Sequence, residues 1–190
     1  MPELSTRIAR TLLVAAVVGS LVIPASAPLP VRAGPEQPGF VDTQALTGLN
    51  QPTAVEFAAD GRVFVAEKSG IIRVFSSLGA TSSLVFADLR TQVHNYWDRG
   101  LLGLALHPNF PTDNCVYVLC ARDTMPGGTA PRWGDGCPSP PGGTGDGCLI
   151  TGRLSVLSAS GNVSTGETVL ITDWGQQYPS HSIGDLAFGL

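Results

Sequence analysis

The chain has 190 residues, of which 43% are hydrophobic and only 14% are charged, and its formal net charge is -4 at pH 7. Glycine (23 residues) and proline (15 residues) are abundant, as in globular proteins with many loops and turns. The sequence contains no run of lysine or arginine, so we expect no nucleic-acid partner.

The N-terminal segment, residues 1–33, has the features of a secretory signal peptide. Two arginines precede an apolar run over residues 12–23, and the small residues Ala25-Ser26-Ala27 follow it. We expect cleavage after Ala27 or Ala33, which gives a secreted protein in the extracellular space or the periplasm. The apolar run is shorter than the roughly 20 residues that a membrane-spanning helix needs, so we expect no stable membrane span after cleavage. An uncleaved anchor is the alternative.

The remaining part, residues 34–190, is long enough for one domain with its own core. Short apolar and β-branched stretches separated by turn residues predict β-strands, and we find no helical periodicity after the signal peptide. The predicted strands are Val55–Phe57, Arg62–Glu67, Ile71–Phe75, Leu84–Phe86, Gly100–Leu106, Cys115–Cys120, Arg153–Leu157, Glu167–Thr172 and Ile183–Phe188.

Turn residues support this all-β prediction. Asp60-Gly61 and Ser69-Gly70 lie between the first predicted strands and tolerate the positive φ of hairpin turns. Residues 122–147 are rich in Gly, Pro and Asp and predict a long loop that leaves the sheet. Recurrent groups of four short strands favour a β-propeller. On periodicity alone, a single-domain β-sandwich is an equal alternative.

Four cysteines, Cys115, Cys120, Cys137 and Cys148, follow the signal peptide, so disulfides are permitted in the compartment that the chain reaches. Three pairings are possible from the sequence. We favour Cys137–Cys148, because both lie in the Gly/Pro-rich loop and closing that loop removes conformational entropy. A zinc site is the alternative, but the spacing is not a paired C-x2-C and no histidine lies among the four. We therefore assign no metal ligand.

Three segments, residues 60–74, 99–110 and 181–189, together resemble the glucose/sorbosone dehydrogenase family. These are soluble sugar dehydrogenases that use pyrroloquinoline quinone (PQQ). The middle segment, R-G-L-L-G-x-A-x-H-P-x-F, is specific, whereas the first also fits other propellers. The resemblance implies a six-bladed β-propeller with the quinone and a calcium ion on its axis, of which residues 34–190 contain the first two to three blades.

The resemblance also implies two site residues. His181 stands where the family has the general base that takes the proton of the sugar's anomeric hydroxyl, and a neutral imidazole suits this task near neutral pH. Asp98 stands where the family has a polar residue, often Gln or Glu, that contacts the quinone, and its shorter side chain reaches less far. Ser180 replaces the aspartate of the soluble glucose dehydrogenases, so glucose is not specifically implied. We expect His107 to be structural and to fix its turn through a side-chain hydrogen bond.

The implied function is secreted, PQQ-dependent oxidation of a small-molecule aldose sugar at its anomeric carbon. The calcium ligands and the cationic residues that hold the quinone are expected beyond Leu190, so we expect a truncated chain that is inactive alone. The first alternative is a secreted propeller that binds carbohydrate or protein without catalysis. A calcium-dependent lactonase or esterase is a further alternative, but the middle segment fits it less well.

Overall fold

The computed structural model describes residues 38–139, 142 and 147–189, so the predicted signal peptide lies outside the described residues. The chain divides into two units, residues 1–42 and 43–190, and all the described strands lie in the second. Within the described ranges the named elements are all strands, and no helix there is long and apolar enough to cross a membrane.

Four strands form the first antiparallel sheet, in the order β1-β2-β3-β4. They are β1 (Pro52–Phe57), β2 (Val63–Glu67), β3 (Ile71–Phe75) and β4 (Ser83–Asp88). Gly61 and Gly70, in the two predicted hairpin turns, have φ values of 91° and 109°, a region that favours glycine. The predicted strands and turns of this region are therefore confirmed.

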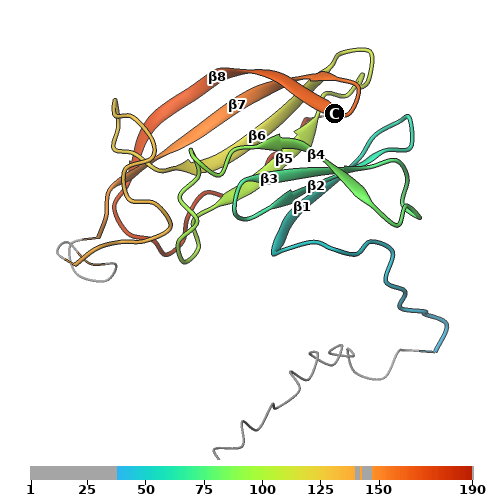
Figure 1. The fold of residues 1–190 in the computed structure, drawn as a ribbon, viewed down its shortest axis with the longest axis horizontal. Helices are drawn as coiled ribbons and strands as arrows, with labels where there is room; N and C mark the ends of the chain where they lie inside the picture. The colour runs from blue at the N-terminus through green and yellow to red at the C-terminus, as the bar shows by residue number, and fades with distance from the viewer. Residues whose placement is uncertain (1–37, 140–141, 143–146, 190) are drawn as a thin grey trace, which may run out of the picture. The chain divides into compact units, whose positions relative to one another are not determined.

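The second antiparallel sheet has the order β5-β6-β7-β8. Its strands are β5 (Leu101–Leu106), β6 (Cys115–Arg122), β7 (Ile150–Ser160) and β8 (Val163–Gln176). The described residues between Arg122 and Ile150, where the long loop is predicted, contain no strand, and residues 140–141 and 143–146 of that loop lie outside the described residues. As Figure 1 shows, β7 and β8 form a long hairpin, and β6 pairs with β7 from Thr151 to Ser158.

The predicted strand Ile183–Phe188 is wrong, because these residues form no strand in the structure. They pass along the second sheet instead, where Leu186 lies close to Gly103 and the Phe188 ring packs edge-on against Tyr117 at 5.0 Å between ring centroids. An apolar run becomes a strand only where its backbone finds a ladder partner.

The core lies between the two sheets. Side chains alternate between the two faces of a strand, so Phe64 and Ala66 of β2 point into this core while Val63 and Val65 pack on the opposite face. Buried residues of β5 and β6, including Leu104 and Val118, complete the core from the second sheet. The burial of these apolar side chains is the main force that holds the sheets together.

Two hydrogen bonds set how the sheets lie against each other. Thr53 Oγ1 in β1 donates to Leu101 O in β5 at 2.7 Å, and Arg62 Nη1 donates to Gly161 O in the β7–β8 turn at 2.6 Å. β1 contacts β5, and β4 contacts β8. Equivalent strands of two consecutive four-stranded meanders thus lie beside each other, which is the arrangement of β-propeller blades.

Candidate active site

The candidate site lies at one edge of the two sheets, meaning the side where strands of both sheets end. Because neighbouring strands are antiparallel, the ends of β2, β4, β6 and β8 lie at the same edge. The segments that follow these four ends are the β2–β3 turn, residues 89–100, residues 123–149 and residues 177–189. The second of these segments carries Asp98 and the last carries His181.

The structure brings these two sequence-predicted residues together. The backbone N–H of His181 donates to Asp98 Oδ2 at 2.9 Å, across a sequence separation of 83 residues. The backbone N–H of Asp98 in turn donates to Pro179 O at 3.2 Å. Both side chains are exposed to solvent. The Asp98 carboxylate and the backbone of His181 are therefore held together at an accessible edge.

The backbone at this edge is strained. His181 has a φ of 55° and Trp97, next to Asp98, has a φ of 51°. Residues other than glycine rarely adopt this left-handed conformation, and they keep it only where the surrounding structure requires it. Trp97 is 51% exposed and its ring stacks on Tyr96 at 6.0 Å between centroids.

A lysine lies at the same edge. Lys68 Nζ donates to Asn95 Oδ1 at 2.6 Å. Partial burial lowers the pKa of Lys68, while the charges of Asp135 and Asp98 act in the opposite direction. We predicted no role for Lys68 from the sequence. Its place at this edge becomes visible only in the fold, where residues 89–100 return to the β2–β3 turn that carries it.

The two glycines of the specific motif are required by close packing. A side chain at Gly100 would collide with the backbone and stem of Lys68, and one at Gly103 would meet Leu119 and the Gly184–Leu186 segment. Gly100 thus lets β5 approach the first sheet, and Gly103 lets it approach the segment that follows His181.

Behind the exposed pair lies a buried cation, Arg99, which is 0% exposed. Its Nη1 donates to Cys148 O at 2.8 Å and to His94 Nδ1 at 3.2 Å, and its Nη2 donates to Gln176 O at 2.8 Å. Burial lowers the pKa of Arg99 to about 10, so the guanidinium is still protonated at neutral pH. Sequence reasoning missed this role, although Arg99 is the first residue of the middle segment.

His94 completes this buried network. Its Nε2 lies 2.7 Å from Gly136 O, so Nε2 carries the proton and Nδ1 accepts the hydrogen bond from Arg99. Burial lowers the pKa of His94, more than the hydrogen bond to Gly136 and the charge of Asp123 raise it. The imidazole is therefore neutral at neutral pH. No role was predicted for this residue.

The predicted disulfide Cys137–Cys148 is confirmed. It closes part of the long loop whose other end is anchored on Asp123, a carboxylate with 0% exposure. The backbone N–H groups of Trp133 and Gly134 donate to this carboxylate at 2.9 and 2.7 Å. The other two cysteines, both in β6, are free.

His107 lies at the opposite edge, in the β5–β6 turn. The Asn109 backbone N–H donates to His107 Nδ1 at 3.2 Å, which is the side-chain hydrogen bond predicted for this turn. Its ring stacks on Tyr117. His107 is thus separated from Asp98 and His181 by the length of the sheet.

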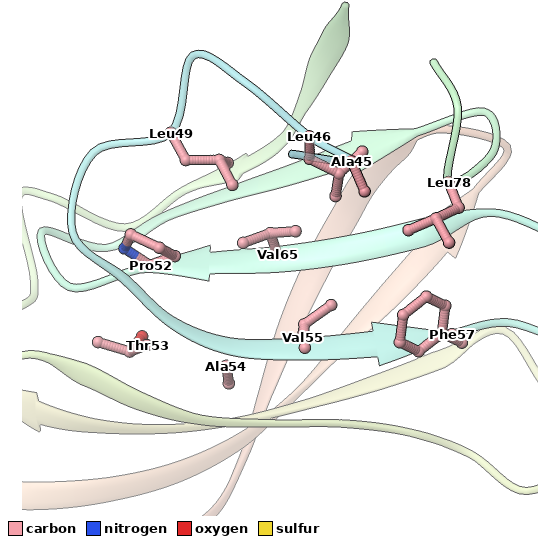
Figure 2. A pocket seen from close by; sticks show the side chains of 10 residues that line it. All are labelled: Ala45, Leu46, Leu49, Pro52, Thr53, Ala54, Val55, Phe57, Val65 and Leu78. Atoms are coloured by element: carbon pink, nitrogen blue, oxygen red, sulfur yellow. The ribbon is translucent and has the colours of Figure 1, made fainter. Parts of the chain in front are cut away.

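An apolar groove of about 380 Å³ lies away from these residues, beside β1. Figure 2 shows side chains of β1, β2 and the segment before β1 around it, with Leu78 from the β3–β4 connection. Neither Asp98 nor His181 lines it. The groove has few polar groups with which to orient a sugar, so we place the candidate chemistry at the strand-end edge.

The comparisons with known proteins find a family match over part of the chain and structures of similar fold. The family described as Glucose / Sorbosone dehydrogenase matches residues 49–132, which include Asp98 but not His181. The Hedgehog-interacting protein of Mus musculus is 31% identical over 81 residues, which cover 40% of this chain and 12% of that protein. The chain therefore spans only a small part of this curated relative.

One solved structure agrees with the family match. A crystal structure from Thermus thermophilus, described as an oxidoreductase (glucose dehydrogenase), superposes with a TM-score of 0.57 and 27% sequence identity. The superposition covers 77% of this chain and 37% of that one. A PQQ-bound aldose sugar dehydrogenase from Streptomyces coelicolor gives a TM-score of 0.45 and 16% identity over 67% of this chain and 31% of its own. The resemblance to the glucose/sorbosone dehydrogenase family is thus confirmed over residues 49–132, and the two described sheets have the fold of two blades of the β-propeller found in such sugar dehydrogenases.

Proposed function

We propose that this chain is part of a secreted sugar dehydrogenase that oxidises an aldose at its anomeric carbon with PQQ as the electron acceptor. One observation carries the proposal: the hydrogen bond from the His181 backbone to Asp98 Oδ2 at 2.9 Å. It joins the two residues that the family resemblance marks as base and quinone contact, although 83 residues separate them. The family match and the superposition support the same reaction class.

His181 is the proposed general base. Its imidazole takes the proton of the anomeric hydroxyl as the O–H bond breaks and the anomeric C=O bond forms, so the sugar becomes a lactone. The quinone, when bound, accepts the hydride that leaves the same carbon. The exposed position of His181 leaves the imidazole accessible to a sugar from solvent.

The residues at this edge fit a carboxylated quinone in part. Asp98 supplies a polar contact beside the base, and the Lys68 ammonium supplies a cation that suits a carboxylate group of PQQ. Calcium belongs to the proposal through the family resemblance alone. We assign no described residue to it.

We expect residues 34–190 alone to be inactive. The described residues form two four-stranded sheets, whereas this chain covers 37% of the dehydrogenase on which it superposes. An open set of blades also leaves sheet faces uncovered. Residues 34–190 that turned over an aldose with added PQQ would contradict this expectation.

The test of the proposal is dye reduction by the complete gene product, supplied with PQQ and calcium and offered a panel of aldoses. We expect reduction with at least one aldose, and none when PQQ is left out. The control is galactitol, a polyol with no anomeric carbon. Folded protein that reduces no dye with any aldose contradicts the proposal.

The alternative is a propeller that binds a protein and catalyses nothing. The observation that favours it is the 31% identity to a curated relative whose name describes interaction with Hedgehog. The same assay separates the two functions, because a binding module neither requires PQQ nor reduces dye.

A further inference from the structure

We propose that Arg99 is a positioning residue, which holds Asp98 against His181 from inside the protein with the help of His94 and the disulfide-closed loop. This inference rests on the proposed function, because it concerns the same pair. Its test has a separate structural measurement, so the two can fail independently.

The guanidinium of Arg99 joins three segments that are distant in sequence. Its own backbone directly follows Asp98. Its Nη2 donates to Gln176 O at 2.8 Å, where the segment that leads to His181 leaves β8. Its Nη1 donates to Cys148 O at 2.8 Å, at the end of the loop closed by the disulfide. One planar group therefore sets the relative positions of the two segments that carry the candidate site.

His94 fixes the orientation of this group. Because His94 Nε2 donates to Gly136 O at 2.7 Å, its Nδ1 is available as an acceptor for Arg99 Nη1. Gly136 directly precedes Cys137 of the disulfide. The imidazole thus connects the guanidinium to the near end of the loop, while Cys148 connects it to the far end.

The strain at the exposed edge explains why such support is needed. Trp97 and His181 both adopt positive φ, and conformations of this kind relax unless neighbouring contacts hold them. Arg99 N donates to Tyr96 O at 3.0 Å across Trp97, and Asp98 N donates to Pro179 O at 3.2 Å near His181. Arg99 therefore holds the chain next to Trp97 through its backbone, and it holds the segment that leads to His181 through its bond to Gln176 O.

A lysine cannot replace this arginine. The guanidinium presents donors in a rigid planar fork, whereas an ammonium group is a compact charge that cannot reach Cys148 O, His94 Nδ1 and Gln176 O together. We therefore expect Arg99→Lys to keep the charge and lose the positioning.

The experiment is a mutant cycle read by NMR on the isotopically labelled chain. Asp98→Ala removes the acceptor of the His181 amide, so it should move the His181 amide proton resonance in the wild-type background. In the Arg99→Lys background we expect the same substitution to move it less than half as far. Arg153→Lys is the matched control, because Arg153 is also mostly buried and bonds Glu167 and Gln92, away from the pair.

Two further variants keep the test decisive if Arg99→Lys does not fold. His94→Leu removes the acceptor for Arg99 and should reduce the His181 shift, whereas His94→Gln keeps one donor and one acceptor and should restore it. In the complete gene product, Arg99→Lys should raise the PQQ dissociation constant about tenfold, since small misplacements are costly at such sites. Wild-type protein without PQQ affinity would overturn the proposed function alone. If Asp98→Ala moved the His181 amide resonance as far in the Arg99→Lys background as in the wild type, the positioning role would be overturned.

Discussion

Glu67 is a buried carboxylate at the end of β2, with only 3% of its side chain exposed. It accepts hydrogen bonds from Arg73 Nε at 2.6 Å and from the Asn50 backbone N–H at 3.0 Å. Arg73→Met should lower the free energy of unfolding by about 3 kcal/mol, because it leaves a buried charge without its ion partner. Urea denaturation measures this change.

The control for this prediction is Arg90→Met. Arg90 pairs with Asp88 at 2.7 Å, but their side chains are 61% and 44% exposed. Exposed ion pairs contribute little, so the expected change is below about 1 kcal/mol. Equal effects of the two substitutions would contradict the assignment of a buried pair at Glu67.

The two free cysteines should differ in reactivity. Burial raises the pKa of the Cys120 thiol to about 12, whereas Cys115 is only half-buried. The thiolate is the reactive form, so iodoacetamide at pH 8 should modify Cys115 and leave Cys120 unmodified until denaturant is added. Peptide mass spectrometry reads the result, and rapid labelling of Cys120 in the native protein would show that β6 is less protected than described.

His94 should make the protein sensitive to mild acid. Its pKa is lowered in the folded state, so below the ordinary value of about 6.5 the unfolded chain binds more protons and the free energy of unfolding falls as the pH falls. His94→Gln removes this titration. Denaturation at pH 7 and pH 5 should therefore give a smaller loss for the variant than for the wild type, and equal losses would argue against a buried neutral imidazole.

At the scale of elements, the sequence predicted eight strands that the structure contains, and it predicted their turns from glycines such as Gly61 and Gly70. It underestimated β8, whose 14 residues mix Ser, Thr and Gly with apolar side chains. Three register irregularities between β7 and β8 also interrupt the alternation. The strand predicted at Ile183–Phe188 failed because pairing depends on a partner that local sequence does not reveal.

The β7–β8 hairpin offers a matched pair of glycine substitutions. The Trp174 ring packs directly on Gly152, so Gly152→Ala should lower the free energy of unfolding by about 1–3 kcal/mol through overpacking. Nothing lies close to the corresponding position of Gly166 on β8, so Gly166→Ala is the control and should change little. Thermal denaturation of both variants measures the difference, and a neutral Gly152→Ala would mean that the Trp174 ring moves aside freely.

The candidate site was predictable only in part. Asp98 and His181 follow from the family resemblance, and the structure places them in contact. The buried Arg99–His94 pair was not predictable, because its acceptors Cys148, Gly136 and Gln176 come from loops whose return no local pattern specifies. Sequence patterns report chemistry at a position, whereas these contacts depend on how distant loops fold back.

At the scale of the whole molecule, the apolar groove beside β1 is an uncovered surface. Val55 and Phe57 are 50% and 61% exposed along it. Exposed apolar patches promote association, so Val55→Ser with Phe57→Ser should reduce self-association of residues 34–190 in analytical ultracentrifugation. Val169→Ser with Leu170→Ser on β8 is the control for exposed apolar residues elsewhere. Equal effects of the two double variants would contradict a specific role of the groove in self-association.

We propose that His181 is the base of a quinone-dependent sugar oxidation, and the most direct test compares wild type and His181→Ala in the complete gene product. Dye reduction gives kcat with an aldose, and equilibrium titration gives PQQ affinity. We predict that kcat falls about 10²- to 10⁴-fold, as expected when a general base is lost, while PQQ affinity changes less than about twofold. Wild-type kcat in His181→Ala would contradict the claim.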